Sequence, residues 1–486
     1  MNAGIDFGTS NCSIGVWHDN EPLLLPLEGD SKRLPSALYT SRMDIQIESI
    51  DQDELADRVD SAIQRQSSAV KRALKNNQTI KELSHAELEN IEHGIMRREI
   101  AERQKGEREE QTIGEALYSD TEIVFGEEAI QRHITDPLDG YFIKSPKSFL
   151  GSDISQHYID FYFEIITRML AFIKQQAELT TKNDIENVVL GRPVNFHGTR
   201  GEVGNVQATD IIKRAAIAAG YKNIEFLMEP IAAALDFERT LSANKIVLVL
   251  DTGGGTTDCT MIKLGPSYIN TLDRIESVLA NSGDRIGGYD FDIKLAQQKI
   301  MPYFGRDSFL LNGLPIPSSI FTQAIAFKDV NAYADFTSFR TGKKIASYLE
   351  QAVEKDKVRR LKKLQEGKLS FRLGRSSELA KIQLTDSESI NLPLEYIEHD
   401  FDVSISRDDL NQSIHRELDV FMSLMKEVEL QAGVSPDIIY VTGGTAKSPV
   451  VKNWLQNVYK DVEIIIGDEF ASVAAGLTTW AHRLYK

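Results

Sequence analysis

Cysteine is scarce in this chain of 486 residues, which contains only Cys12 and Cys259. Two cysteines exclude a disulfide-rich scaffold, and without a cluster of histidines they form a poor set of metal ligands. We interpret both as small residues buried in strands rather than as catalytic groups. The chain is therefore expected to lack disulfides and to work in a reducing compartment.

Long apolar runs are also missing. No segment of the sequence approaches the roughly 20 consecutive apolar residues that span a bilayer. The first six residues, MNAGID, lack the charged and then apolar pattern of an export signal. We predict a cytoplasmic protein without a membrane anchor.

Positive charge is in short supply as well. The chain has 55 Lys and Arg against 72 Asp and Glu, a net charge of −17. This balance argues against a general binder of nucleic acids or anionic membranes, because phosphate backbones select basic surfaces. It does not exclude a single nucleotide, which needs only a local pocket. A composition of 42% hydrophobic and 26% charged residues is typical of globular proteins, and the length predicts about three domains.

One short phrase occurs twice. Residues 6–13 read DFGTSNCS and residues 251–260 read DTGGGTTDCT, so that aligning Thr9 with Thr256 gives two similar patterns. Each copy follows an apolar stretch. A single copy is equally consistent with an ordinary glycine hairpin at the end of a strand. The repetition predicts two similar half-molecules that face one phosphate-bearing ligand.

Apolar runs mark several strands. The segments 186–191, 245–250 and 437–442 are typical of strands buried on both faces, and 12–16 and 259–262 of half-buried return strands. Helices are expected over 208–219, 230–237 and 470–484, with Gly220 ending the first. This alternation indicates a mixed α/β fold. Small residues would let the last two helices pack closely: Ala232, Ala233, Ala234, Ala471, Ala474, Ala475 and Gly476.

The segment from about 45 to 120 is dense in Glu, Lys, Arg and Gln and lacks proline. We favour one or two exposed amphipathic helices inserted in the first half of the chain over a partly disordered loop. A second charged helix is expected over 349–368. The apolar positions near helical spacing in the insertion are Leu55, Val59, Ile63, Leu83, Leu88, Ile91 and Ile95.

The two glycine turns have residues suited to phosphate. Glycine lets successive amides converge on an anion, and the hydroxyls of Thr9, Ser10, Thr256 and Thr257 add donors. The acids Asp6, Asp251 and Asp258 would repel phosphate unless a divalent cation and its waters lay between them. The set therefore indicates a magnesium-bound di- or triphosphate.

Residues 6–11 resemble the first phosphate loop of the actin-like ATPase superfamily, which includes the 70-kilodalton heat-shock chaperones, actins and sugar kinases. Residues 251–258 resemble its second phosphate loop in the chaperone form. Further segments resemble chaperone motifs in the same order along the chain: 147–151 (KSFLG), 191–196 (GRPVNF), 228–235 (MEPIAAAL), 287–292 (GGYDFD), 443–449 (GGTAKSP) and 468–469 (DE). The chain is most similar to the short, chaperone-like bacterial proteins of the YegD type.

The resemblance implies a two-lobed actin-like ATPase built from duplicated ribonuclease H-like domains. Lobe I would hold 1–243 and 467–486, with the charged insertion, and lobe II would hold 244–466. The helices after Glu229 and Asp468 would form the hinge. No peptide-binding domain is expected after Lys486. The implied function is slow, weak hydrolysis of ATP to ADP and phosphate, with lobe closure regulating an unknown client or co-chaperone, which the insertion would contact.

The resemblance also assigns roles to single residues. The catalytic set would be Lys147, Glu229, Asp6, Asp251 and Thr256, with Asp6, Asp251 and Asp258 holding Mg²⁺ through waters. Phosphate contacts would come from Gly8, Thr9, Ser10, Asn11, Gly254, Gly255 and Thr257, and ATP or ADP would have its adenosine bordered by Gly283, Gly287, Gly288, Gly443, Gly444, Lys447 and Asp468.

Alternatives remain open at several of these positions. Lys147 is separated by only three residues from Lys144, and Glu229 is also suited to the first turn of a helix. The family's base-binding helix has an acid, a lysine three residues on, and then Leu-Ser. When Leu369-Ser370 is aligned with the family's Leu-Ser, Lys363 takes the position of the acid and Glu366 takes that of the lysine. The two charges are therefore reversed relative to the family. Rival functions are a cytoskeletal filament ATPase and a small-molecule kinase.

Overall fold

A computed structural model describes residues 1–41, 52–75, 84–85, 88–89, 92, 96, 122–135, 140–196, 201–269, 271, 274–326, 330–467 and 472–485. Its fold is mixed α/β, as predicted. Two large sheets have the same strand order, β3-β2-β1-β8-β9 and β12-β11-β10-β15-β16. The first contains β1 (Asn2–Phe7), β2 (Asn11–His18), β3 (Glu21–Leu24), β8 (Asn187–Arg192) and β9 (Asn223–Met228), with β4 (Leu34–Pro35) beside β2. The second contains β10 (Lys245–Thr252), β11 (Thr257–Leu264), β12 (Val278–Asp284), β15 (Ile438–Thr442) and β16 (Glu463–Ile466).

The register of the two central hairpins corrects the alignment of the repeated phrase. Asp6 lies opposite Ser13 in the first hairpin, and Asp251 lies opposite Asp258 in the second. The equivalent residues are therefore Asp6 and Asp251, two positions away from the alignment of Thr9 with Thr256. The sequence match was misleading because hydroxyl residues recur in both turns, whereas hydrogen-bonded register fixes the true equivalence. Cys12 and Cys259 are consequently not equivalent, although both are buried and free, as interpreted from the sequence.

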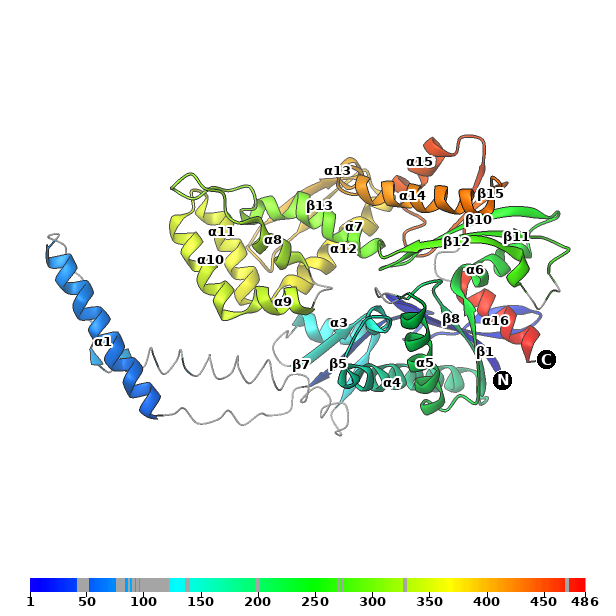
Figure 1. Cartoon of the computed structure of the whole chain (residues 1–486), viewed down its shortest axis with the longest axis horizontal. Coiled ribbons are helices and arrows are strands. Elements are labelled where there is room, and N and C mark those ends of the chain that lie inside the picture. The colour runs from blue at the N-terminus through cyan, green and yellow to red at the C-terminus, as the bar shows by residue number, and fades with distance from the viewer. Residues whose placement is uncertain are drawn as a thin grey trace.

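Helices cover both faces of each sheet. The first sheet contacts α4 (Gln156–Thr181), α5 (Glu202–Ala218) and α16 (Ser472–Leu484), and the second contacts α6 (Glu229–Glu238) and α14 (His415–Ala432). Helices α6 and α16 pack together between the sheets (Figure 1). The return strands β2 and β11 are almost entirely buried rather than half-buried, because each has a helix on both faces.

Two small sheets and further helices extend these layers. One small sheet is formed by β5 (Ala37–Ser41), β6 (Ile123–Phe125) and β7 (Gly140–Lys144), and the other by β13 (Ser389–Pro393) and β14 (Asp402–Ser406). The remaining helices include α3 (Gly126–Thr135), α7 (Gly288–Leu295), α8 (Ser318–Ile325), α9 (Val330–Thr337), α10 (Phe339–Gln351), α11 (Lys355–Glu366), α12 (Ser370–Asp386), α13 (Arg407–Ser413) and α15 (Pro449–Val458).

Two predicted helices have different bounds. Helix α5 begins at Glu202, six residues before the predicted start at 208, and ends before Gly220, whose φ is +96°. The helix expected over 349–368 is divided into α10 and α11, because Ala352 is extended, pairs with Leu310, and is followed by a hydrogen bond from Val353 N to Phe309 O of 2.9 Å.

Close packing between α6 and α16 depends on small residues, as predicted. A β-carbon added at Gly476 of α16 would lie 1.8 Å from the carbonyl oxygen of Ala232 in α6. The same helix rests on the first sheet at Gly4, where an added β-carbon would lie 2.2 Å from the backbone nitrogen of Thr478. The glycines bring three backbones into direct contact.

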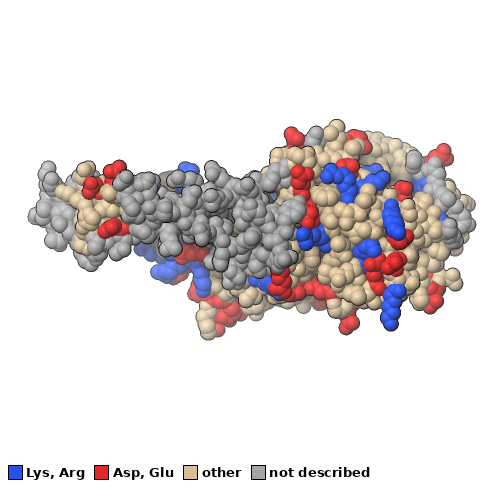
Figure 2. Space-filling view, turned by 90° about the horizontal axis from the view of Figure 1, so that it is seen from below, with Lys and Arg blue, Asp and Glu red and all other residues tan. Residues whose placement is uncertain are grey.

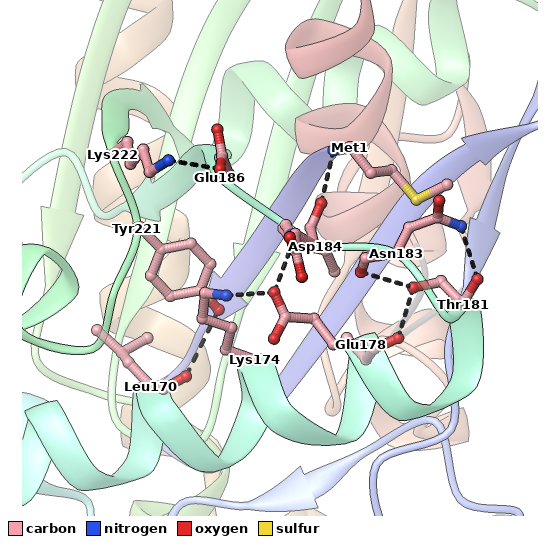
Figure 3. Close-up of polar contacts among 12 residues, drawn as sticks. Met1, Leu170, Lys174, Glu178, Thr181, Asn183, Asp184, Glu186, Tyr221 and Lys222 are labelled. Atoms are coloured by element: carbon pink, nitrogen blue, oxygen red, sulfur yellow. Dashed lines mark hydrogen bonds and ion pairs between the residues drawn. The ribbon is translucent and has the colours of Figure 1, made fainter.

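Polar contacts near the N-terminus fix the starts of two interior strands of the first sheet (Figure 3). The amino group of Met1 donates to the carbonyl oxygen of Asp184 at 2.7 Å, just before β8. The carboxylate of Glu178, near the end of α4, accepts from the backbone nitrogen of Ile185 at 2.7 Å and pairs with Lys174. These bonds tie the starts of β1 and β8 to the helix that covers them.

Within the charged segment 45–120, the structure describes α1 (Gln52–Lys75), which stands apart from the sheets (Figure 1). Leu55 and Val59 are buried against Met96, with Ile63 beside them. Leu88 is also buried, whereas Leu83, Ile91 and Ile95 lie outside the described residues. Among the described helices, none is long and apolar enough to cross a bilayer.

Candidate active site

Each central hairpin closes with the same hydrogen bond. Gly8 N donates to Asn11 O at 3.1 Å, and Gly253 N donates to Thr256 O at 2.9 Å. Each turn thus follows a strand that carries an aspartate two residues before its first glycine, Asp6 in β1 and Asp251 in β10. The duplicated strand order therefore presents two matching turns.

The two turns meet. A β-carbon added at Gly254 would lie 1.6 Å from Ser10 Oγ, so the glycine leaves room for the serine hydroxyl of the other turn. The Ser10 hydroxyl is buried and has no hydrogen-bond partner among the described residues. An orphaned donor at the contact of two glycine turns is suited to an anion, because a buried unsatisfied hydroxyl is costly.

Helix α7 fixes the second turn from behind. Gly288 N donates to Gly253 O at 3.0 Å, and Tyr289 N donates to Gly254 O at 2.7 Å. A β-carbon added at Gly287 would lie 2.7 Å from the backbone of Gly254. Gly287 and Gly288 thus stand at the start of α7, and they contact the second turn directly.

One lysine lies in a group of buried acids. Lys147 Nζ is 2.5 Å from Glu229 Oε1, and the lysine side chain is only 4% exposed. The short 3₁₀ helix of residues 146–149 carries Lys147, while Glu229 begins α6. Glu229 and Lys147 lie close enough to Asp6, Asp251 and Asp258 to shift the pKa values of all three aspartates.

Burial and repulsion raise the pKa of every aspartate in this group. Burial raises the pKa of Asp6 to about 7, with a contribution from Glu229 that Lys147 opposes. Burial and the charge of Glu229 raise the pKa of Asp258 to about 8, and the pKa of Asp251 lies well above its usual value for the same reasons. Four acids around one lysine would leave an excess of negative charge when ionised, so a divalent cation at this place would favour the ionised carboxylates.

The acids do not form a direct coordination shell. Among the residues that the structure describes, no group of three His, Cys, Asp or Glu side chains is placed to hold a metal ion. Asp6, Asp251 and Asp258 would therefore act on a hydrated ion such as Mg²⁺, which keeps several of its waters.

The structure separates Lys147 from Lys144. Burial alone would lower the pKa of Lys147, but the negative charges of Glu229 and Asp6 outweigh it and raise that pKa, so the ammonium group stays charged. Lys144 Nζ instead lies 4.6 Å from the ring centre of Tyr289 and 5.2 Å from that of Phe371. Lys147 therefore lies with Glu229 and Asp6, whereas Lys144 lies against Tyr289 and near Glu378.

The segment 191–196 also reaches the acids. A β-carbon added at Gly191 would lie 3.2 Å from Glu229 Cγ. The backbone of Val194 donates a hydrogen bond to Asp258, which partly offsets the rise in that carboxyl's pKa. The loop that follows β8 of the first sheet therefore contacts Asp258 in β11 of the second sheet.

The predicted phosphate contacts are placed unequally. Thr257 is the first residue of β11, and its hydroxyl donates to the carbonyl oxygen of Ile286 at 2.7 Å, so it ties the strand to the turn before α7. Thr256 and Gly255 remain in the turn itself, as do Thr9 and Ser10 in the first turn. These hydroxyl residues share the same chemistry, but only those that lie in a turn are placed to contact a phosphate there.

The residues predicted around adenosine fall into two groups. Gly288 lies near Thr445 Oγ1 and Lys381 Nζ, which would be 3.1 and 3.2 Å from an added β-carbon. Gly283 and Gly443 instead adjoin the acids: added β-carbons would lie 2.6 Å from Asp258 Oδ1 and 2.9 Å from Asp251 Oδ1. Gly444 and Lys447 are exposed, and Asp468 lies outside the described residues.

Helix α12, rather than the segment around Lys363 and Glu366, lies against Gly288 beside the second turn. Those two residues of α11 line a surface pocket with Arg359 and Arg360. Lys381 of α12 donates to Gly288 O at 2.9 Å and pairs with Asp292 at 2.8 Å.

The sequence contained a signal for this helix. Glu378 is followed three residues later by Lys381 and then by Leu384-Thr385, which is the family's pattern with Thr in place of Ser. The match is not literal, because Thr385 stands where the family pattern has serine. Thr445 had no comparable signal, because its position beside Gly288 depends on the loop after β15 folding against α7.

Comparison with known proteins agrees with this geometry. Residues 154–308 match the protein-family model described as Hsp70 protein. The chain contains an Hsp70-family ATPase domain. The matched region includes Glu229, the second turn and the start of α7, which lie together in the site.

Two chaperones from Rickettsia illustrate the relationship. The chain is 32% identical to the chaperone protein HscA homolog of Rickettsia prowazekii over 167 residues, or 34% of this chain and 24% of that protein. It is 26% identical to the HscA homolog of Rickettsia felis over 320 residues, or 64% of this chain and 37% of that protein. The chain thus spans well under half the length of these relatives. The finer likeness to YegD-type proteins stays a prediction.

Proposed function

We propose that this Hsp70-family chain binds Mg-ATP between two lobes and slowly hydrolyses it to ADP and phosphate. The single observation that carries the proposal is the buried ion pair of Lys147 and Glu229 among three aspartates with raised pKa values. A charged lysine in a buried site stabilises negative charge that develops in phosphoryl transfer.

The proposed roles follow the placement of the residues. Asp6, Asp251 and Asp258 would hold the hydrated Mg²⁺, which supplies charge neutralisation when bound. The turns at Gly8–Asn11 and 253–256 would bind phosphate oxygens through their amides, with Ser10 Oγ as a further donor. Glu229 orients Lys147 and is suited to position the attacking water. Glu378, Lys381, Gly288 and Thr445 would border adenosine.

The proposed lobes are the two sheets with their covering helices, and α6 and α16 between them would form the hinge. Lobe I would hold 1–243 and 467–486, and lobe II would hold 244–466. Nucleotide binding would close the lobes, because each contributes one turn to the phosphate site.

The function is tested by comparing ATP turnover in matched lysine variants. Lys147→Ala is expected to reduce single-turnover hydrolysis by about 100-fold, while ADP affinity changes much less, because the ammonium group acts mainly on the transition state. Lys174→Ala is the control, since it removes another lysine–glutamate pair of the first sheet's layer, 15% exposed and away from the turns. Equal turnover in Lys147→Ala and wild type would contradict the mechanism.

The biological role proposed is chaperone-like regulation of a protein partner, with helix α1 and its flanking charged segment as the contact surface. Helix α1 is amphipathic: Asp57 and Asp60 are exposed, whereas Leu55 and Val59 are buried. On the face in Figure 2, Lys and Arg are interspersed with Asp and Glu over the described residues, which favours protein over nucleic acid. Deleting 45–120 should release the partner, and unchanged pull-down partners would rule out this surface.

A further inference from the structure

Ser36 lies between β4 and β5 and is only 1% exposed. Its hydroxyl donates to the carbonyl oxygen of Gly8 at 2.7 Å, and its backbone nitrogen donates to the carbonyl oxygen of Ser10 at 2.8 Å. One residue thus holds the first phosphate turn at two of its carbonyl groups, those of Gly8 and Ser10.

The same residue also contacts the segment that carries Lys147. Ser36 O accepts from Ser145 N at 2.8 Å, and Ser145 is the residue before the short helix of residues 146–149. Ser145 is held in the left-handed region at φ 57°, a conformation that a non-glycine residue adopts only when its surroundings fix it. A two-residue path, from Ser145 to Lys147, therefore connects Ser36 to the ammonium group.

A role in packing alone accounts for only part of this arrangement. Cys12 Sγ lies 3.3 Å from Ser36 Oγ, in a hydrogen bond between two buried side chains of the first sheet's layer. The other three bonds all reach either the first phosphate turn or the lysine segment. Since the backbone bonds of Ser36 need no particular side chain, only its hydroxyl requires serine or threonine.

We infer that Ser36 is a positioning residue, whose hydroxyl fixes the first phosphate turn relative to Lys147 through a shared hydrogen-bonded connection. This inference rests on the proposed hydrolysis of ATP at the same site. A displacement of about 1 Å between reacting groups lowers a rate by up to about 100-fold, so a single buried hydrogen bond can control turnover without contacting substrate.

The test uses the full chain with Ser36→Ala, Ser36→Thr and Ser413→Ala. Ser413 is the matched control, because its hydroxyl is also buried, at 2% exposure, and donates to a backbone carbonyl, Asp409 O, at 2.7 Å. Ser36→Ala is expected to lower single-turnover ATP hydrolysis by about 10-fold or more while ADP affinity changes by less than about threefold. Ser36→Thr should recover most of the rate, and Ser413→Ala should retain it.

A second measurement needs no nucleotide. Amide hydrogen exchange at residues 8–11 should accelerate by about 10-fold in Ser36→Ala and stay unchanged in Ser413→Ala, because only the first variant releases the turn. Equal effects of Ser36→Ala and Ser413→Ala on both rate and exchange would overturn the inference.

The two proposals fail in different ways. If the wild type hydrolyses ATP and Lys147→Ala does not, but Ser36→Ala matches the wild type in rate and exchange, only the positioning role is lost. If the wild type lacks turnover, the proposed function is lost, and exchange at residues 8–11 still decides whether Ser36 holds the turn.

Discussion

Asp258 illustrates how a functional site costs stability at the level of one residue. Its pKa is raised from 3.8 to about 8 by burial and by Glu229. In the unfolded chain the carboxyl ionises above pH 3.8, whereas in the fold it keeps its proton to about pH 8. The unfolded state therefore binds fewer protons in this window, and the fold loses stability as the pH rises from about 4 to 8.

Asp258→Asn should remove this loss. In the absence of Mg²⁺ and nucleotide, its melting temperature at pH 8 is expected to exceed that of the wild type by roughly 5 °C, with a smaller difference at pH 5. The exposed Asp402→Asn serves as the control in the same thermal denaturation series. A gain that does not depend on pH would contradict the account of buried charge.

His133 has the opposite pH dependence. It is stacked on Phe142 at 4.5 Å between ring centres, and burial lowers its pKa from 6.5 to about 4. Because only the unfolded state gains the proton between pH 6.5 and 4, the fold should lose stability as the pH falls through that window. His133→Phe should reduce the slope of the free energy of unfolding against pH there. His399→Phe is the control. Because His399 is exposed, this variant should keep the wild-type slope of the free energy of unfolding against pH.

At the scale of elements, the contact between α6 and α16 depends on a missing side chain. Gly476→Ala would place a β-carbon 1.8 Å from Ala232 O, a backbone atom that cannot move without shifting the helix. We expect a loss of about 2 kcal/mol or more in the free energy of unfolding, measured by denaturant titration.

Gly342→Ala is the matched control in α10. Its added β-carbon would meet the Gln365 side chain at 3.1 Å, which can adjust, and alanine favours helix by about 1 kcal/mol over glycine. If both glycine variants changed stability equally, close helix approach would not explain Gly476.

At the scale of the whole molecule, an aromatic contact joins the two proposed lobes away from the hinge. Phe371 of α12 lies 4.7 Å from Phe142 of β7 and 5.2 Å from His133 of α3, measured between ring centres. Arg375 of α12 also lies 3.6 Å from Glu127 of α3. These contacts oppose opening of the proposed cleft.

Phe371→Ala should therefore speed release of a fluorescent ADP analogue by about 10-fold in stopped-flow measurements, because it removes two aromatic contacts across the lobes. Phe309→Ala is the control, since this phenylalanine of the second lobe is 53% exposed. Unchanged release from Phe371→Ala would show that opening occurs without breaking this contact.

The sequence by itself determined several central strands, the glycine turns and the residue types of the candidate site. Continuous apolar runs such as 245–250 and the glycines of both turns have local physical causes, so they could be predicted one segment at a time. Lys147 and Glu229 were also predicted, because a family resemblance covers short, ordered motifs.

The tertiary structure decided what depends on register and on distant packing. It made Asp6 and Asp251 equivalent through the register of the two hairpins, and it buried both return strands between helices. It also directed the Thr257 hydroxyl to a hydrogen bond with the carbonyl oxygen of Ile286. It also brought Lys381 to Gly288 from a helix nearly a hundred residues away and joined Ser36 to two parts of the site. Sequence spacing does not encode such contacts, because they form only when several buried layers pack together.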